Sequence, residues 1–146
     1  MNQYDDATRG TFQTDYGKQL ISFEGLRFKG RNGICNVTPT DIDGLVQLDN
    51  ENCCIFFELK HSGSVPMGQR TALTKICDAI EAGGMKCVIF VAIHNTPSTQ
   101  TIIAKDAIVS DTYWHGKWYK EPKNRKLHEI AMDFVNYLGK ETLCHE

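Results

Sequence analysis

Hydrophobic and polar positions along the chain repeat with the periods expected of helices and of strands. Helical spacing of apolar residues predicts three helices, over residues 11–24, 68–82 and 124–138. Apolar or alternating runs predict strands over residues 26–31, 40–48, 53–60 and 86–93, with two more between 101 and 119. This order predicts an α/β fold, with a central mixed β-sheet flanked by helices and an added C-terminal hairpin and helix.

Glycines follow each predicted helix and are expected to end it: Gly25, Gly83-Gly84 and Gly139. Asn32-Gly33 is a typical hairpin turn. The helix over 68–82 joins two apolar strands, 53–60 and 86–93, and this arrangement favours a parallel crossover connection.

The strand Cys53-Cys54-Ile55-Phe56-Phe57-Glu58-Leu59-Lys60 ends in charged residues. Side chains alternate between the two faces of a strand, so Glu58 and Lys60 share one face, roughly 7 Å apart, and Leu59 points to the other. Asp43, on the preceding strand, is expected to reach the same face across a short polar turn. Charges beside a core are costly unless they are paired or bound to a metal. The convergence of two carboxylates and an ammonium therefore indicates a site for a hard divalent cation.

Length and composition fit a single cytoplasmic domain spanning residues 1–146. Of the 146 residues, 41% are hydrophobic and 23% charged, and no window approaches the ~18 apolar residues of a membrane span. The polar, acidic N-terminus is unlike a signal peptide. The six cysteines include Cys53, Cys54, Cys77 and Cys87 within apolar runs and are interpreted as reduced core residues.

Two polar residues are expected on the inward faces of helices. Glu24 lies four residues after Leu20, and Gln69 lies four residues before Leu73. Each has an ordinary alternative: Glu24 as a solvated carboxylate on a fraying last turn, and Gln69 as a capping or packing residue.

Basic residues suggest two surfaces for a phosphate backbone. One is the alternating strand face of Arg27, Lys29 and Arg31, and the other contains Lys117 and Lys120 among aromatic residues that could stack on bases. A solvated strand face and an aromatic core hairpin are the respective alternatives. The net charge of −2 counts modestly against strong non-specific DNA binding.

Asp43, separated by fourteen residues from Glu58-Leu59-Lys60, resembles the PD-(D/E)xK motif of the restriction-endonuclease-like nucleases. The order of elements expected over residues 11–93 is similar to the αβββαβ core of that family. This chain has Asp41-Ile42-Asp43 where the family has Pro-Asp, and Pro39 is displaced. Asp41 is therefore a rival for the first acid. Asp43 is preferred because Gly44-Leu45-Val46 continues the strand behind it.

The resemblance implies a metal-dependent nuclease that hydrolyses phosphodiester bonds. Asp43 and Glu58, with the backbone carbonyl of Leu59, would hold Mg²⁺ or Mn²⁺, and Lys60 would position or help deprotonate the attacking water. Glu24 and Gln69 match a Glu and a Gln on helices that recur in several branches of the family. The expected partner is nucleic acid, with DNA as the first expectation, and no membrane. A small phage-type endonuclease or a Holliday junction resolvase, either of which could be a homodimer, is the function implied.

A second function class stays open: a non-catalytic module that uses the same fold to bind nucleic acid or protein. The complete set of two acids and a lysine favours the nuclease, because a family member that had lost activity would more often have lost one of the three.

Overall fold

A computed structural model describes residues 24–29, 36–37, 42–62, 67–122 and 124–144. The chain divides into two compact units, Met1–Thr40 and Asp41–Glu146. In the first unit, β1 (Phe28–Lys29) and β2 (Asn36–Val37) form an antiparallel pair, with Phe28 opposite Val37. This pairing agrees with the hairpin predicted at Asn32-Gly33. Because β1 pairs with β2 in a separate two-stranded sheet, it does not join the central sheet as the first strand of an αβββαβ core would.

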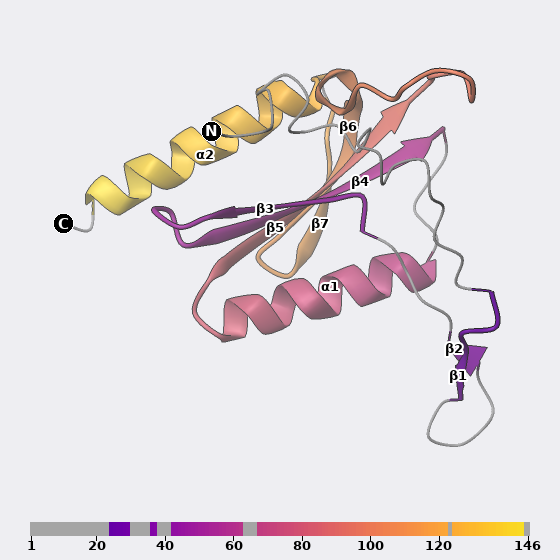
Figure 1. Ribbon diagram of the computed structural model, residues 1–146. Coiled ribbons are helices and arrows are strands. Elements are labelled where there is room, and N and C mark those ends of the chain that lie inside the picture. The colour runs from indigo at the N-terminus through magenta and orange to yellow at the C-terminus, as the bar shows by residue number, and fades with distance from the viewer. Residues whose placement is uncertain (1–23, 30–35, 38–41, 63–66, 123, 145–146) are drawn as a thin grey trace, which may run out of the picture. The chain divides into compact units, whose positions relative to one another are not determined.

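The second unit is built on a five-stranded mixed sheet in the order β3-β4-β5-β6-β7, drawn between two helices in Figure 1. Its strands are β3 (Gly44–Leu48), β4 (Cys53–His61), β5 (Lys86–His94), β6 (Ile108–Trp114) and β7 (Lys117–Lys120). Strands β4 and β5 are parallel, and the other neighbours are antiparallel. The predicted central mixed sheet, the helices predicted over 68–82 and 124–138, and the C-terminal hairpin are therefore confirmed.

Helix α1 (Met67–Ala82) connects β4 to β5, as predicted for a parallel crossover. Gly83 and Gly84 follow it, and Gly84 adopts a φ of +99°, a conformation that favours glycine at the end of a helix. The hairpin between β6 and β7 turns at His115-Gly116, where both residues have positive φ, as in the type I′ turns that suit twisted strands.

Helix α2 (Leu127–Cys144) differs most from its prediction. It begins three residues later than expected and passes through Gly139, which was predicted to end it. Glycine within a helix costs only about 1 kcal/mol relative to alanine, so neighbouring packing can carry a helix through it. A short 3₁₀ helix, η2 (Ala104–Asp106), precedes β6 and was not predicted.

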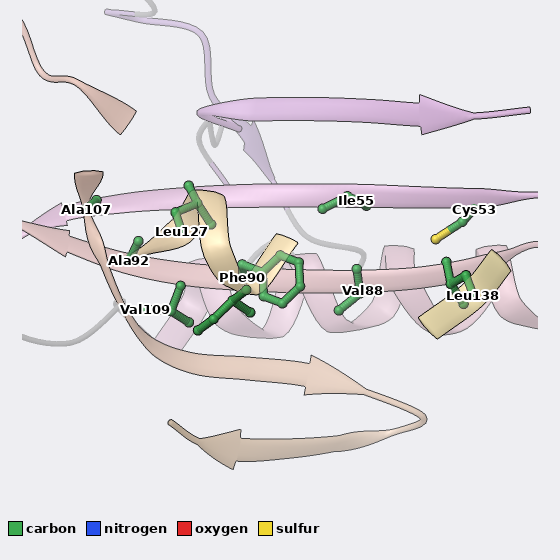
Figure 2. Close-up of a cluster of buried hydrophobic side chains, with 10 residues drawn as sticks. Cys53, Ile55, Val88, Phe90, Ala92, Ala107, Val109, Leu127 and Leu138 are labelled. Atoms are coloured by element: carbon green, nitrogen blue, oxygen red, sulfur yellow. The ribbon is translucent and has the colours of Figure 1, made fainter. Parts of the chain in front are cut away.

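Each face of the sheet has its own hydrophobic core. On the α2 face, Figure 2 shows Phe90 near the middle of a cluster that includes Cys53, Ile55, Val88 and Leu138. On the α1 face, the core contains Phe56, Leu73, Cys77, Ile89 and Tyr113. The strands alternate between these clusters, since β4 sends Ile55 to one and Phe56 to the other.

The four cysteines whose side chains are described, Cys53, Cys54, Cys77 and Cys87, are free thiols, as predicted. Burial raises the pKa of Cys53 from 9.0 to about 12. The pKa of Cys87 is also raised, first by its side-chain hydrogen bond with Cys77 and then by burial. These thiols therefore behave as core side chains.

Candidate functional site

The end of β4 holds Glu58, one of the two acidic residues predicted to bind the metal. Glu58 is 0% exposed, and no other charged side chain in the described part of the chain is fully buried. Leu59 packs against the α2-face core, while Phe56 belongs to the α1-face core. Glu58 and Lys60 alternate with Leu59, so both lie on the α1 face, as predicted.

Asp43 lies directly beside this strand end. Its Oδ2 accepts a hydrogen bond from the backbone N–H of Leu59 at 2.7 Å. Strand β3 begins at Gly44, which pairs with Phe57, and continuing that register by one residue places Asp43 opposite Glu58. Where the backbone pairing of β3 with β4 ends, the Asp43 carboxylate therefore accepts the next hydrogen bond from β4. Asp43 was predicted within a strand starting at residue 40, whereas the described strand begins one residue after it.

Backbone geometry places a further oxygen at the same position. The N–H and C=O groups of one residue in an extended strand point to the same side. Since the Leu59 N–H points to Asp43, the Leu59 carbonyl faces that side as well. Gly44 allows the close approach of the two strands, because a Cβ there would lie 3.2 Å from Cδ2 of Phe57.

The sheet register continues this polar position across the α1 face. Glu58 of β4 aligns with Val91 of β5, and Val91 aligns with Asp111 of β6. With adjacent strands ~4.8 Å apart, the Cα atoms of Glu58 and Asp111 are separated by about 10 Å. A register shift between Val91 and Ala92 lies at the same level, where β-bulges often re-aim side chains.

Arg70, in the first turn of α1, extends over this row of residues. Its Nη2 lies 3.7 Å from Oδ1 of Asp111, and its guanidinium lies 4.2 Å from the centre of the Trp118 ring. Asp111 also accepts a hydrogen bond of 2.9 Å from the Ser110 hydroxyl. The contact with the Trp118 ring and the ion pair hold Arg70 beside Asp111 on the α1 face.

Sequence reasoning missed Asp111 and Arg70. Asp111 lies two residues before Tyr113, a buried residue whose hydroxyl donates to Asp78 Oδ1 at 2.6 Å. An acidic residue at an inward-facing position of an aromatic strand is the signal that could have identified it. Arg70 has no comparable signal, because an arginine in the first turn of a helix is usually solvated.

The remaining predicted residues lie in several parts of the chain. Glu24 lies in a turn with Gly25, and its side chain is exposed. The helix predicted over 11–24 lies, apart from residue 24, outside the described residues. Arg27 and Lys29 are exposed residues of the first unit. Lys117 and Lys120 are exposed on β7. Gln69 belongs to the first turn of α1, but its side chain lies outside the described residues, as do Arg31 and Asp41.

No group of three or more His, Cys, Asp or Glu side chains that could hold a metal ion occurs among the described residues. The oxygen donors at the end of β4 are two carboxylates and one carbonyl. Mg²⁺ is commonly held by one or two carboxylates together with waters and substrate phosphates, so this donor set fits such an ion. Within the same ranges, no helix combines the length and the apolar character needed to cross a membrane.

Comparisons with family models, with curated proteins and with solved structures found no match for this chain.

Proposed function

We propose that this protein is a metal-dependent nuclease that hydrolyses the phosphodiester bonds of DNA. The observation that carries this proposal is the hydrogen bond from the Leu59 N–H to Asp43, which holds an acidic side chain against Glu58-Leu59-Lys60. This contact supports the proposal, because Asp43 lies beside the strand that carries Glu58 and Lys60. The burial of Glu58 supports the proposal further, because placing an acidic side chain in a core is costly and packing alone does not call for it.

Asp43, Glu58 and the Leu59 carbonyl would hold Mg²⁺ or Mn²⁺. When bound, such an ion lowers the pKa of a coordinated water and offsets the negative charge that develops on the phosphate. Lys60 shares the face of Glu58 and would contribute a fixed positive charge beside the attacking water. Arg70, held over the same face by Asp111 and Trp118, would contact a phosphate of the substrate. The roles predicted for Gln69 and Glu24 stay predictions.

The direct test is to incubate the purified protein with single-stranded, duplex and branched DNA and with RNA, in Mg²⁺, in Mn²⁺ and in EDTA. We expect cleavage of DNA that depends on the divalent ion. Lys60→Ala should lower the rate by roughly 100-fold or more, with little loss of metal or DNA binding, because its charge acts in the chemical step. Lys75→Ala, at an exposed position of α1, is the matched control. Absence of metal-dependent cleavage on every substrate would contradict the proposal.

Metal binding distinguishes an active site from a structural ion pair. Glu58→Ala should weaken Mn²⁺ binding measured by calorimetry, because anionic oxygens hold a hard cation. Glu129→Ala, at an exposed acid of α2, should leave the titration unchanged. If Glu58 and Lys60 only neutralised each other, Glu58→Ala would break a buried ion pair, lower stability by about 3–5 kcal/mol and change no binding.

One observation favours a second candidate function. The bond from the Leu59 N–H gives Asp43 a structural task that requires no metal, since it closes the end of a strand. A non-catalytic module that binds nucleic acid or protein is consistent with that task. Nucleic-acid binding that persists in EDTA, without cleavage in Mg²⁺ or Mn²⁺, would support this candidate instead.

A further inference from the structure

A cavity of about 450 Å³ lies on the α2 face of the sheet, away from Glu58. Its floor includes Phe90 of β5 and Trp114 of β6, and its walls include Phe134 and Tyr137 of α2 and Tyr119 of β7. Five aromatic side chains thus surround a space within the size range of small-ligand pockets.

The rings of this cavity present both packed and exposed surfaces. Phe134 makes edge contacts with Trp114, at 5.0 Å between centroids, and with Phe90, at 5.8 Å. Tyr119 and Tyr137 are 50% and 49% exposed. A flat ring that entered the cavity would cover the apolar surface of these tyrosines. It would also contact Phe134, whose position is fixed by its packing against Trp114 and Phe90.

Charged side chains at the edge of the cavity indicate what such a ring would carry. Arg125 and Asp133, which both line the cavity, form an ion pair with each other. Lys117 and Lys120 lie on either side of Tyr119 on β7, are exposed, and form no ion pair within the described part of the chain. Glu121 is the remaining acidic residue of the lining. Within the lining, the positive charges of Lys120 and Arg125 balance the negative charges of Glu121 and Asp133. Lys117 lies two residues before Tyr119, on the same face of β7, and adds an exposed positive charge beside that ring.

We propose that this cavity binds an unpaired base of single-stranded DNA, with Lys117 and Lys120 contacting the adjacent phosphates. Aromatic stacking surfaces beside basic residues are the features by which proteins hold single strands without sequence preference. This inference rests on the proposed function for its choice of DNA. Because Glu58 lies on the α1 face, the cavity would hold a segment of the strand at a distance from the bond that is cleaved.

The two tryptophans of the chain allow a direct test, since they lie on opposite faces of the sheet. Trp114 lines the cavity, whereas Trp118 lies under Arg70 on the α1 face. In the Trp118→Phe variant, all indole emission comes from Trp114. We expect a short oligothymidylate in EDTA to quench that emission saturably. In the Trp114→Phe variant, the emission of Trp118 should stay unchanged under the same conditions.

Substitutions around the cavity separate stacking from charge. Tyr119→Ala should weaken oligothymidylate binding about tenfold, while Tyr119→Phe should bind like the wild type. Lys117→Ala combined with Lys120→Ala should reduce the slope of log affinity against log salt concentration by about 1.4, or ~0.7 for each phosphate that a lysine no longer neutralises. The exposed residues Lys75 and Lys105 provide the control pair, and replacing both by alanine should leave the slope unchanged.

The use of EDTA keeps this test independent of cleavage. Saturable quenching of Trp114 by oligothymidylate supports the inference even if no nuclease activity is found. No quenching, or equal affinity for duplex DNA, overturns it even if the protein cleaves DNA. Equal affinity for thymidine monophosphate also overturns it, because the cavity would then be a site for a free small molecule.

Discussion

Two neighbouring rows of residues cross the same three strands and differ in chemistry. On the α2 face, Leu59, Ala92 and Val109 follow one another across β4, β5 and β6, and all are apolar. One residue earlier on β4, the row on the α1 face reads Glu58, Val91 and Asp111. The strands are the same and the level in the sheet is nearly the same, but only the α1 face ends in acidic side chains.

This difference indicates that the two faces have different tasks at this end of the sheet. The sheet could continue its core with apolar residues on both sides, as the α2 face demonstrates. Burying Glu58 where Leu or Val would fit costs stability, unless its charge is compensated. An acid at such a position, beside Asp43, agrees with the proposed site.

The largest effect is expected on the apolar face. Phe90 is 2% exposed and contacts the rings of Phe57 and Phe134. Phe90→Ala should lower the free energy of unfolding by about 3–5 kcal/mol, because it removes a buried ring and leaves a cavity. Urea denaturation followed by circular dichroism measures this loss.

Glu58→Gln is the comparison on the other face. It removes the charge and keeps the shape, so no cavity forms and the free energy of unfolding should fall by less than it does in Phe90→Ala. Should Glu58→Gln destabilise the protein as much as Phe90→Ala, the buried acid would be a structural element, and the contrast between the two faces would lose its functional meaning.

The burial of the Cys53 thiol on the α2 face predicts a loss of stability at alkaline pH. Burial raises the pKa of Cys53 from 9.0 to about 12, so the folded protein binds this proton more tightly than the unfolded chain. The resulting contribution to stability is fully present below pH 9 and is lost as the pH rises toward 12. In that range the loss is about 1.4 kcal/mol per pH unit.

Replacing Cys53 isolates this contribution. Below pH 9, Cys53→Ala should lower the free energy of unfolding by a constant amount. Between pH 9 and 11, the free energy of unfolding of the variant should fall less steeply with pH than that of the wild type. Urea denaturation at each pH measures both effects. Parallel curves for the two proteins would show that the sulfur is accessible to water and that the α2 face is less well sealed than its burial indicates.

The row of Glu58, Val91 and Asp111 can also be tested at Asp111, on β6. Asp111→Asn removes the ion pair with Arg70, whose side chains are partly exposed, so stability should fall by only ~0.5–1 kcal/mol. If the row serves the proposed nuclease, the rate of DNA cleavage should fall at least tenfold, because Arg70 loses its alignment. Asp106→Asn removes a comparable ion pair with Lys126, at 3.5 Å, and should leave cleavage unchanged.

The parts of the fold that sequence predicted best are those with strong local patterns. The apolar runs of β4 and β5 and the amphipathic helix between them were located to within one residue at each end, because burial on both faces leaves little ambiguity. The start of β3 was placed four residues too early, since the exposed Leu45 and Val46 give an edge strand little pattern to define it.

The candidate site was predictable where it lies within one strand. The alternation of Glu58, Leu59 and Lys60 follows from strand geometry alone. Asp111 could be recognised as an inward-facing acid of an aromatic strand, but its contact with Arg70 was not predictable. That contact depends on the order β4-β5-β6 and on where α1 begins over the sheet. Such contacts between distant segments leave no local periodicity in the sequence.

The smallest effect concerns Gly139, where the sequence pattern and the structure disagree about the end of α2. The structure continues the helix to Cys144. Apart from the adjoining residues and the backbone of the helix itself, no described atom lies within 4 Å of the position that a Cβ would take at Gly139. Gly139→Ala should therefore raise the free energy of unfolding by ~0.5–1 kcal/mol, since alanine favours the helix without a clash. If the helix instead ended at Leu138, position 139 would require a left-handed conformation and alanine would lower stability. The sign of the change in the free energy of unfolding, measured by urea denaturation, thus decides whether α2 extends beyond Leu138, a buried residue of the α2-face core.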